Sequence, residues 1–475
     1  MAKGVRGAAP STNSSIHPTV EARGKEPYYT VTWLFVASPA IAVLLGGLLV
    51  CSSCAWAQPG LNVLDFGAVA DGKTDCTKAF QDALDEAGKR GDPVYAPAGH
   101  YRFEGHLRVP EAVTLMGTWQ GPPSREKGTV LLVTEGKGRE DGPPFVTLEG
   151  AAAVKGLHFV YPEQVVNEAP PVPYPWTIRG LAQDCGIYDC LIVRAWQAVD
   201  FGTYPCSRHV INGLYGSPLR RGIYIDGSVD VGRISNVHFT SFFFPYKGPL
   251  DEWKLNNGEA FIIGKADWEW IENCFALRYN VGFRFLKGTG GNEKRTGPPN
   301  YVAITRSGID ESHTTMIVED SSGITVSQSV FKGWAAQIRD SNTGPIKFSQ
   351  CWFSPMPGTG CLMEAMGKDR VSFVDCRFEF WDTQGDLSPA LKAGCASLLV
   401  QGCEFGTHNR TPYFIGERQK TQIEILPSVR SAVITGNRLR YGESVINHSE
   451  GDIRLCDNVV DDYDWWDEKD AGEEG

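Results

Sequence analysis

The run "GKADWEWIENC" (264–274) carries two carboxylates two residues apart, Asp267 and Glu269, beside Lys265. Glycoside hydrolysis uses two carboxyl groups roughly 5–10 Å apart, one as general acid and the other as nucleophile or base. Residues two apart in a β-strand lie on the same face, about 6–7 Å from each other. We therefore predict that Lys265, Asp267 and Glu269 face outward and that the two carboxylates are catalytic candidates. Trp268 and Trp270 would then face inward.

Other catalytic candidates lie near this run. Asp226 and Asp230 form a second pair of carboxylates, although Asp side chains also close turns. Removal of the proton beside a uronate carboxylate needs instead a Lys, Arg, His or Tyr base and a positive partner. His238 and Lys265 are catalytic candidates for that reaction. A lyase can also use Ca²⁺, held by Asp or Glu oxygens, as the neutralising charge; otherwise we expect no cofactor.

An aromatic insertion follows His238 and contains Phe243, Tyr246 and Trp253. Aromatic faces stack on the apolar faces of sugar rings, so we predict that these residues bind substrate together with Arg278 and Tyr279. The alternative is that the insertion folds back to cover the protein's own surface. No His/Cys cluster has the spacing of a zinc site, and we predict no bound metal apart from the optional Ca²⁺.

A short phrase recurs along the chain after residue 150: apolar, any residue, Asn/Asp/Gln/Gly, a small residue, any residue, apolar. The shortest steps between copies are 21 to 27 residues. This period is typical of stacked β-coils, whose inner faces form one continuous core. We predict that the small residue turns inward at the same corner of every coil, which makes the recurrent cysteines structural, and that longer steps contain inserted loops. The copies are IYDCLI (187–192), ISNVHF (234–239), IENCFA (271–276), VSQSVF (326–331), FSQCWF (348–353), FVDCRF (373–378), VQGCEF (400–405), ITGNRL (434–439) and LCDNVV (455–460).

A helix is predicted before the repeats, at the end of the stretch 62–87, where Thr74 or Asp75 can cap its start. Five apolar residues fall on one of its faces: Ala79, Phe80, Ala83, Leu84 and Ala87. An uncovered end of a β-stack pairs readily with other chains, so we expect this helix to cover the first coil.

Composition and charge limit the choice of partners. The 475 residues are 42% hydrophobic, enough for a large core, and the net charge is −11 with no basic block. Nucleic-acid binding needs clustered Lys and Arg, so we expect no nucleic-acid partner. An acidic glycan remains compatible with such a chain through a local basic groove.

Both ends of the chain differ from the repeats. Residues 1–57 are predicted to be an export signal, with an apolar segment at 34–50 and Ala55-Trp56-Ala57 before cleavage at Gln58. We expect an exported protein, periplasmic, cell-surface or extracellular, with no stable membrane insertion after cleavage. If the signal is retained, the protein would be membrane-anchored. Residues 461–475 form an acidic tail that we expect to be solvated.

The segments "NVLDFGAVADGKTDCTKAFQDALDEA" (62–87) and "VYAPAGHYRFEGHLRVPEAVTLMG" (94–117) closely resemble the N-terminal signature of the pectate-lyase-like superfamily. More narrowly, they resemble its rhamnogalacturonase/epimerase-like members, which are related to glycoside hydrolase family 28. The resemblance implies an all-β fold, a single-stranded right-handed parallel β-helix with an N-terminal capping helix. The cap and first coils would occupy 58–117 and the remaining coils 118–460. It also implies action on polysaccharides, commonly acidic ones, by a monomer or homotrimer.

The sequence departs from the best-known members of this superfamily. It lacks the Asn-Thr-Asp, Gly-His-Gly and Arg-Ile-Lys motifs of pectin hydrolases, so no named catalytic residue carries over. We predict a secreted enzyme, a glycoside hydrolase or a lyase, acting on a pectin-like or other uronate-containing polysaccharide. The alternative is a non-catalytic β-helix that binds glycans or serves in surface adhesion.

Overall fold

The computed structural model of the protein describes residues 60–122, 127–241, 243–290, 295–406, 421–439 and 442–460. All of them belong to one compact unit, residues 58–475. The predicted export signal (1–57) and the acidic tail (461–475) lie outside the described residues. Within the described ranges, no helix is long and apolar enough to cross a membrane.

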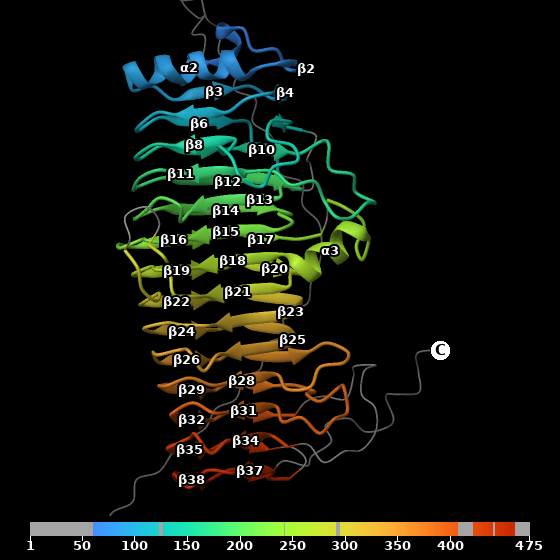
Figure 1. Ribbon diagram of the computed structural model, residues 1–475, viewed down its shortest axis with the longest axis vertical. Helices are drawn as coiled ribbons and strands as arrows, with labels where there is room; N and C mark the ends of the chain where they lie inside the picture. The colour runs from blue at the N-terminus through green and yellow to red at the C-terminus, as the bar shows by residue number, and fades with distance from the viewer. Residues whose placement is uncertain are drawn as a thin grey trace, which may run out of the picture. The chain divides into compact units, whose positions relative to one another are not determined.

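The described strands pair in parallel along three lines, here called sheets A, B and C, and Figure 1 shows the stack of coils that they form. Each coil contributes one strand, or half of a longer strand, to each sheet, except that the first and the last described coils contribute none to sheet C. Sheet A contains β1 (Leu61–Asn62), β3 (Val94–Ala96), β6 (Thr114–Gly117), β9 (Ala153–Lys155), the first halves of β12 (Gly186–Val193) and β14 (Val210–Gly216), β16 (Gly232–Ser235), β19 (Glu269–Glu272), β22 (Val302–Thr305), β24 (Ile324–Ser327), β26 (Ile346–Ser349), β29 (Arg370–Val374), β32 (Ser397–Gln401), β35 (Ser431–Thr435) and β38 (Asp452–Cys456).

Sheet B follows sheet A around one corner of each coil. It contains β2 (Asp71–Asp75), β4 (Gly99–Phe103), β7 (Thr129–Val133), β10 (Leu157–Val160), the second halves of β12 and β14, β17 (His238–Phe239), β20 (Phe275–Leu277), the first halves of β23 (Gly308–Val318) and β25 (Val330–Ile338), β27 (Trp352–Pro355), β30 (Arg377–Phe378), β33 (Glu404–Phe405), β36 (Arg438–Leu439) and β39 (Val459–Val460).

Sheet C closes each coil. It contains β5 (Leu107–Val109), β8 (Val146–Leu148), β11 (Trp176–Gly180), β13 (Gln197–Phe201), β15 (Arg221–Ile225), β18 (Glu259–Ile263), β21 (Val281–Phe285), the second halves of β23 and β25, β28 (Met363–Ala365), β31 (Leu391–Ala393), β34 (Ile423–Ile425) and β37 (Val445–Asn447). The predicted fold, a right-handed parallel β-helix, is confirmed.

The corner between sheets A and B explains the recurrent phrase. Its third position adopts a left-handed conformation, with φ of 56° at Asn236 and 53° at Asn273, and Asn, Asp and Gly tolerate this conformation best. Its fourth position turns inward and bonds to the next coil. The Cys403 amide donates to Asn437 Oδ1 at 2.8 Å, and the Asn437 amide donates to Asn458 Oδ1 at 3.1 Å. The predicted inward corner is therefore confirmed.

The recurrent cysteines are core residues, as predicted. Cys274, Cys351, Cys376 and Cys403 are all buried thiols without a disulfide. The core that they join is continuous from one end of the described coils to the other.

The predicted helix is α2 (Thr77–Arg90), which lies over the first coil at the top of Figure 1. Its residues Phe80, Ala83, Leu84 and Ala87 are fully buried against that coil, so the predicted covering face is confirmed. The 3₁₀ turn η1 (Val63–Phe66) precedes it.

The prediction that long steps hold inserted loops is wrong for one of the three longest steps and incomplete for another, because these two contain extra coils. An extra coil lies between residues 192 and 234, because β14 pairs with both β12 and β16. Another lies between 276 and 326, where β22 and the start of β23 form a coil of their own. That step also holds an inserted segment, since β21 ends at Phe285 and β22 begins only at Val302. The step between 239 and 271 is an insertion that contains α3 (Pro249–Asn257), which projects beside the coils in Figure 1.

Candidate functional site

The carboxylate-rich run predicted to face outward is split between the inside and the outside of the coil. Glu269 opens β19 and is completely buried, whereas Trp270 is 42% exposed. The cause is Trp268, whose left-handed φ of 62° interrupts the alternation between Asp267 and Glu269. Asp267 and Lys265 stay at the surface, where Lys265 Nζ lies 2.7 Å from Asp267 Oδ1. The prediction of one outward face was therefore wrong for Glu269 and for both tryptophans.

Glu269 forms an ion pair with His209 inside the coil. His209 Nε2 lies 3.0 Å from Glu269 Oε1, its Nδ1 lies 2.7 Å from the Cys206 carbonyl oxygen, and both side chains are fully buried. Burial on its own would lower the pKa of His209, but the Glu269 carboxylate and the carbonyl oxygen outweigh it and the pKa is raised. Glu269 thus lies where no polymer can reach it.

Asp226 serves as an acceptor that holds a neighbouring segment. It is buried, and it accepts hydrogen bonds from the Tyr224 hydroxyl and from the backbone amides of Lys265, Thr289 and Gly290, at 2.8 to 3.2 Å. These donors occupy both oxygens of its carboxylate. The environment is that of a structural carboxylate rather than of a proton donor or acceptor in catalysis.

Asp230 lies in the turn between β15 and β16, whereas His238 lies in sheet B. Asp230 is about half exposed, pairs with Arg208 at 3.5 Å and accepts a hydrogen bond from the Val231 amide. His238 opens β17 in sheet B, where its ring lies between Tyr215 and Phe275 at centroid distances of 6.2 and 5.0 Å. Burial lowers the pKa of His238, which keeps the imidazole neutral at pH 7. The structure does not join these two residues into one site with Asp267.

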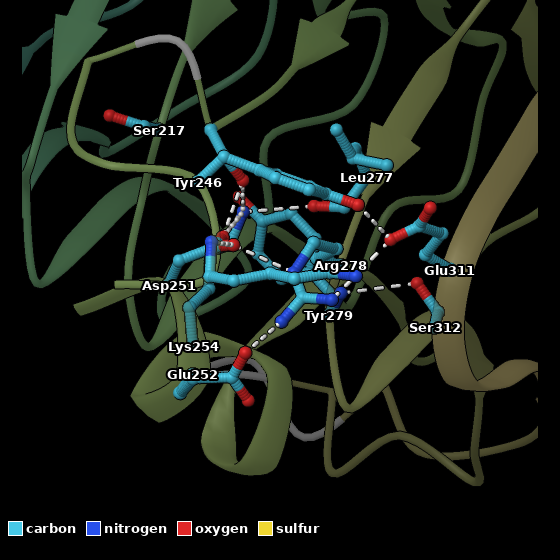
Figure 2. Close-up of polar contacts among 12 residues, drawn as sticks. Ser217, Tyr246, Asp251, Glu252, Lys254, Leu277, Arg278, Tyr279, Glu311 and Ser312 are labelled. Carbon is cyan, nitrogen blue, oxygen red and sulfur yellow. Dashed lines mark hydrogen bonds and ion pairs between the residues drawn. The ribbon is translucent and has the colours of Figure 1, made fainter. Parts of the chain in front are cut away.

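The aromatic insertion folds back onto the coils through a buried charge network, shown in Figure 2. Asp251 of α3 accepts from Arg278 Nε at 2.6 Å and from the Ser241 hydroxyl at 2.5 Å. Lys254 Nζ donates to the Leu277 carbonyl oxygen at 2.8 Å and to Ser241 at 3.0 Å. Burial lowers the pKa of Lys254 to about 8, although Asp251 opposes the shift. The network fastens α3 to sheet B.

Arg278 is the cation at the surface side of this network. It is almost fully buried and pairs with Glu252 and with Glu311, the latter at 3.4 Å. Tyr246, half exposed beside it, donates its hydroxyl to Glu311 at 2.5 Å. Each of the three guanidinium nitrogens of Arg278 therefore lies against a protein carboxylate.

The other predicted substrate-binding residues pack against the protein itself. Phe243 is buried on the outer face of sheet B in a cluster with Leu191 and Val193. Trp253 packs on Trp196 with a centroid distance of 5.0 Å. Tyr279 is fully buried and donates its hydroxyl to the Pro218 carbonyl oxygen at 2.8 Å. The alternative interpretation, that the insertion covers the protein's own surface, describes these residues.

An open cleft of about 400 Å³ lies instead on the outer face of sheet A. Its floor is a row of outward residues in register on four successive strands: Trp270 on β19, Ala303 on β22, Thr325 on β24 and Lys347 on β26. Three of its aromatic side chains are strongly exposed, because Trp268 and Tyr301, at 49% and 58%, join Trp270. Soluble proteins rarely gather large exposed apolar surfaces without a binding role.

The aromatic rings of the cleft are arranged for stacking. Trp268 and Tyr301 come from the turns that precede β19 and β22, and their rings stack at 4.9 Å with an angle of 30°. Arg233, which pairs with Trp270 in register from β16, places its guanidinium 5.4 Å from the Trp270 ring centroid. The cleft therefore gathers three exposed aromatic rings, two of which stack on each other while the third lies against a guanidinium.

The charge of the cleft is positive. Among the described residues that line it, Lys347 is the one charged residue and none is acidic. The neighbouring Glu272, two residues beyond Trp270 on β19, is neutralised by an ion pair with Arg306. The cleft can stack sugar rings and bind a carboxylate, but its lining does not supply the two carboxyl groups of a glycosidase.

The prediction for the run 264–274 does not find the cleft residues because it assigns the polar residues to the outward face and the tryptophans to the inward face. The recurrent phrase contains the information that corrects this. Its first apolar position, here Ile271, faces the core in every coil, so Glu269 must also face inward and Trp270 outward. No cluster of three or more His, Cys, Asp or Glu among the described residues is suited to a metal ion.

The chain is similar in sequence and in structure to several known proteins. Residues 60–155 match the family described as "Rhamnogalacturonase A/epimerase, pectate lyase-like", so the resemblance of the N-terminal signature is confirmed. The chain is 25% identical to rhamnogalacturonase A of Aspergillus niger over 320 residues, which cover 60% of this chain and 67% of that protein. It is 58% identical to alginate lyase 7 of Azotobacter vinelandii over 45 residues, 9% of this chain and 5% of that protein. The A-module of mannuronan C-5 epimerase AlgE4 from Azotobacter vinelandii superposes with a TM-score of 0.46 at 14% identity, over 84% of this chain and all of that module.

Proposed function

We propose that this protein acts on an acidic polysaccharide, which it binds in the aromatic cleft of sheet A. The observation that carries the proposal is the convergence of Trp268, Trp270 and Tyr301 with a single cation, Lys347, in one open cleft. Aromatic faces stack on sugar rings, and a lysine meets a uronate carboxylate. The volume of about 400 Å³ falls in the range of about 300–1,000 Å³ typical of small-ligand sites.

The related proteins support the same substrate class. Their names refer to rhamnogalacturonan and alginate, which are polymers with uronate units. One is named for its polymer and the other as a lyase, so the relatives favour carbohydrate-active chemistry without selecting one reaction. The apolar segment and the Ala-Trp-Ala site within residues 1–57 support action outside the cytoplasm.

A second candidate function is glycan binding without catalysis. The specific observation in its favour is that the lining of the cleft contains no Asp or Glu. A hydrolase would therefore need carboxylates from outside the lining, whereas a binding protein or uronate-specific lyase would not.

The first experiment measures binding to polygalacturonate, alginate, rhamnogalacturonan and a neutral glucan. Trp270→Ala is expected to weaken binding to the preferred polymer about tenfold, because loss of about 1.4 kcal/mol of stacking and burial is a factor of ten. Trp352→Ala is the matched control, since Trp352 is similarly exposed, at 39%, but lies on sheet B. Equal affinities of the two variants would contradict the proposal.

The second experiment separates charge recognition from stacking and reads out the reaction. Lys347→Gln should weaken binding to polyuronates and reduce its dependence on salt, while leaving binding to any neutral glycan unchanged. New reducing ends without unsaturated products would indicate a hydrolase, and absorbance from unsaturated uronates a lyase. Binding without either product and without a change in the uronate composition of the polymer would assign the chain to the second candidate function, because an epimerase changes that composition without cleaving the chain.

A further inference from the structure

The aromatic cleft crosses four successive coils of the stack. Each of the strands β19, β22, β24 and β26 contributes one outward residue to its floor, and these strands follow one another down the stack in Figure 1. The turn before each strand contributes one residue to a wall: Trp268, Tyr301, Gly323 and Pro345. A chain-like ligand can therefore follow the stack from one coil to the next with the same kind of contact on each.

The row of outward residues continues one coil beyond the cleft, to an exposed arginine. Arg233 of β16 pairs in register with Trp270, and four register steps join it to Lys347. At about 4.8 Å per step, the backbones of these two cations lie roughly 19 Å apart. Between them lie Trp270, Ala303 and Thr325, so the row consists of a cation, an aromatic ring, two short side chains and a second cation.

The protein does not neutralise either of these cations. The neighbouring Arg306 forms an ion pair with Glu272, whereas no described carboxylate pairs with Arg233 or Lys347. Both cations are therefore available to anionic groups of a ligand. A ligand that followed the strand β19 instead would meet only one of them and would approach Glu272, two residues beyond Trp270.

We propose that the ligand is a uronate chain that runs across the strands, and that Arg233 binds a second carboxylate about four sugars away from the one at Lys347. The inference rests on the proposed function, because it requires the cleft to bind an acidic polysaccharide. One unit of a linked pyranose chain has about the same length as the spacing between two coils. About five units therefore cover the row, with a carboxylate at each end and a ring stacked on Trp270.

The separation of the two cations predicts a dependence on chain length. A uronate trimer can contact only one of them, whereas a hexamer can contact both at once, and its second contact is then intramolecular. We expect the wild type to bind hexagalacturonate or hexamannuronate at least about fivefold more tightly than the trimer of the same sugar.

The test is Arg233→Gln, with affinities for the trimer and the hexamer measured by calorimetric titration. The variant should bind the hexamer about fivefold more weakly and the trimer less than about twofold more weakly. Its slope of log affinity against log salt for the hexamer should fall to about half, because one of two cations that displace counterions is lost. Arg233→Lys keeps the charge and should bind the hexamer within about twofold of the wild type.

Arg454→Gln is the matched control. Arg454 lies in the same row of sheet A, four register steps beyond Lys347, and pairs with Asp452 at 2.9 Å. No aromatic residue lies in the row between Lys347 and Arg454. Because its charge is already met and the cleft does not reach it, this substitution should leave both affinities unchanged.

The outcomes separate this inference from the proposed function. If Trp270→Ala and Lys347→Gln weaken binding and Arg233→Gln does not, the inference alone is overturned. Equal weakening of the trimer and the hexamer by Arg233→Gln would also overturn it, because Arg233 would then act through Trp270 rather than on a distant sugar. A wild type that binds neither oligomer would overturn the proposed function, and the inference with it.

Discussion

Replacing His209 alone by leucine is predicted to destabilise the β-helix. Replacing both His209 and Glu269 by leucine should change the free energy of unfolding little. The single change leaves the Glu269 carboxylate fully buried without its cation, and Glu269 Oε2 already has no hydrogen-bond partner among the described residues. Removal of one member of a buried ion pair costs about 3–5 kcal/mol, and apolar replacement of both members is often neutral.

The two side chains of this pair share one space in the core, so they are best replaced together. His209 immediately precedes Val210, which pairs with Arg233, and Gly232 pairs with Glu269, so the two side chains meet across the coil that contains Gly232. A side-chain carbon at Gly232 would lie only 2.3 Å from Glu269 Oε2 and 2.5 Å from the His209 ring. The glycine leaves the room that the pair fills, and two leucines of similar volume can occupy the same space.

The expected effect can be stated as a melting temperature. Unfolding entropy is about 2.1 cal/mol/K per residue, which gives roughly 0.8 kcal/mol/K for a body of about 400 residues. A loss of about 4 kcal/mol should therefore lower Tm by about 5 °C in His209→Leu, against less than about 2 °C in the double variant. His448→Leu is the control, because His448 pairs with Glu424 at the surface and such pairs contribute about 0–1 kcal/mol.

The pair also predicts a pH dependence. The pKa of His209 is raised above its ordinary 6.5, so the folded state holds an extra proton between pH 6.5 and the raised value. The stabilisation is complete below pH 6.5 and is lost as the pH rises through the folded pKa. Scanning calorimetry across this window should show the wild type losing Tm relative to the double variant. A double variant that melts as low as His209→Leu, or a Tm difference independent of pH, would refute the reasoning.

Two further substitutions test the other buried groups. Asp226→Ala removes the carboxylate to which the amides of Lys265, Thr289 and Gly290 donate, so limited proteolysis at 286–297 should become at least about tenfold faster. Asp230→Ala is the control and should leave the rate near that of the wild type. An unchanged rate in Asp226→Ala would show that the carboxylate does not hold the segment. Lys254 has a pKa of about 8 in the folded state against an ordinary 10.5, so the folded state binds fewer protons between these values and wild-type stability should rise with pH there. Lys254→Met lacks this term, so the Tm of the wild type minus that of the variant should increase between pH 8 and 10; a constant or falling difference would argue against a desolvated lysine.

The repeat made the fold predictable because its chemistry is local. A left-handed corner favours Asn, Asp or Gly, and a small inward residue must follow, so each coil leaves the same short trace in the sequence. Two coils escaped notice where that trace was weakest. Gly213 is followed by the bulkier Leu214, and Arg306 occupies the left-handed corner with φ of 48°. Tertiary pairing holds these coils in place where local preference is poor.

The candidate site was harder to predict because it depends on which face of a strand is buried. One left-handed residue, Trp268, shifts the alternation so that a carboxylate points into the core and a tryptophan into solvent. The place of Ile271 in the repeat indicates that Glu269 faces inward, but the run 264–274 contains no group that stabilises the buried carboxylate. The group that stabilises the buried carboxylate is His209, 60 residues earlier in the chain. Its position beside Glu269 becomes known only once the coils are stacked.

The insertion with α3 shows the same limit from the opposite direction. Its aromatic and charged residues have the composition of a sugar-binding loop, and Tyr246 and Arg278 do lie side by side, 5.2 Å from guanidinium to ring centroid. Asp251 of the insertion, however, forms ion pairs with Arg278 and Lys254, so these cations are not available to a ligand. Composition shows which contacts a loop can make, and the pairing of charges within the loop decides whether any remain for a partner.

The buried pair and the cleft are two faces of the same strand. Glu269 is adjacent in sequence to Trp268 and Trp270, so the hydrogen bond that fixes Glu269 against His209 also fixes the backbone that aims both indole rings outward. If the cleft binds a sugar chain as proposed, a floor held from beneath loses little conformational freedom on binding, and preorganisation of this kind strengthens binding. A polar pair in the core, which costs desolvation where leucines would serve for stability alone, is thereby accounted for by the rigidity that it gives to the cleft above it.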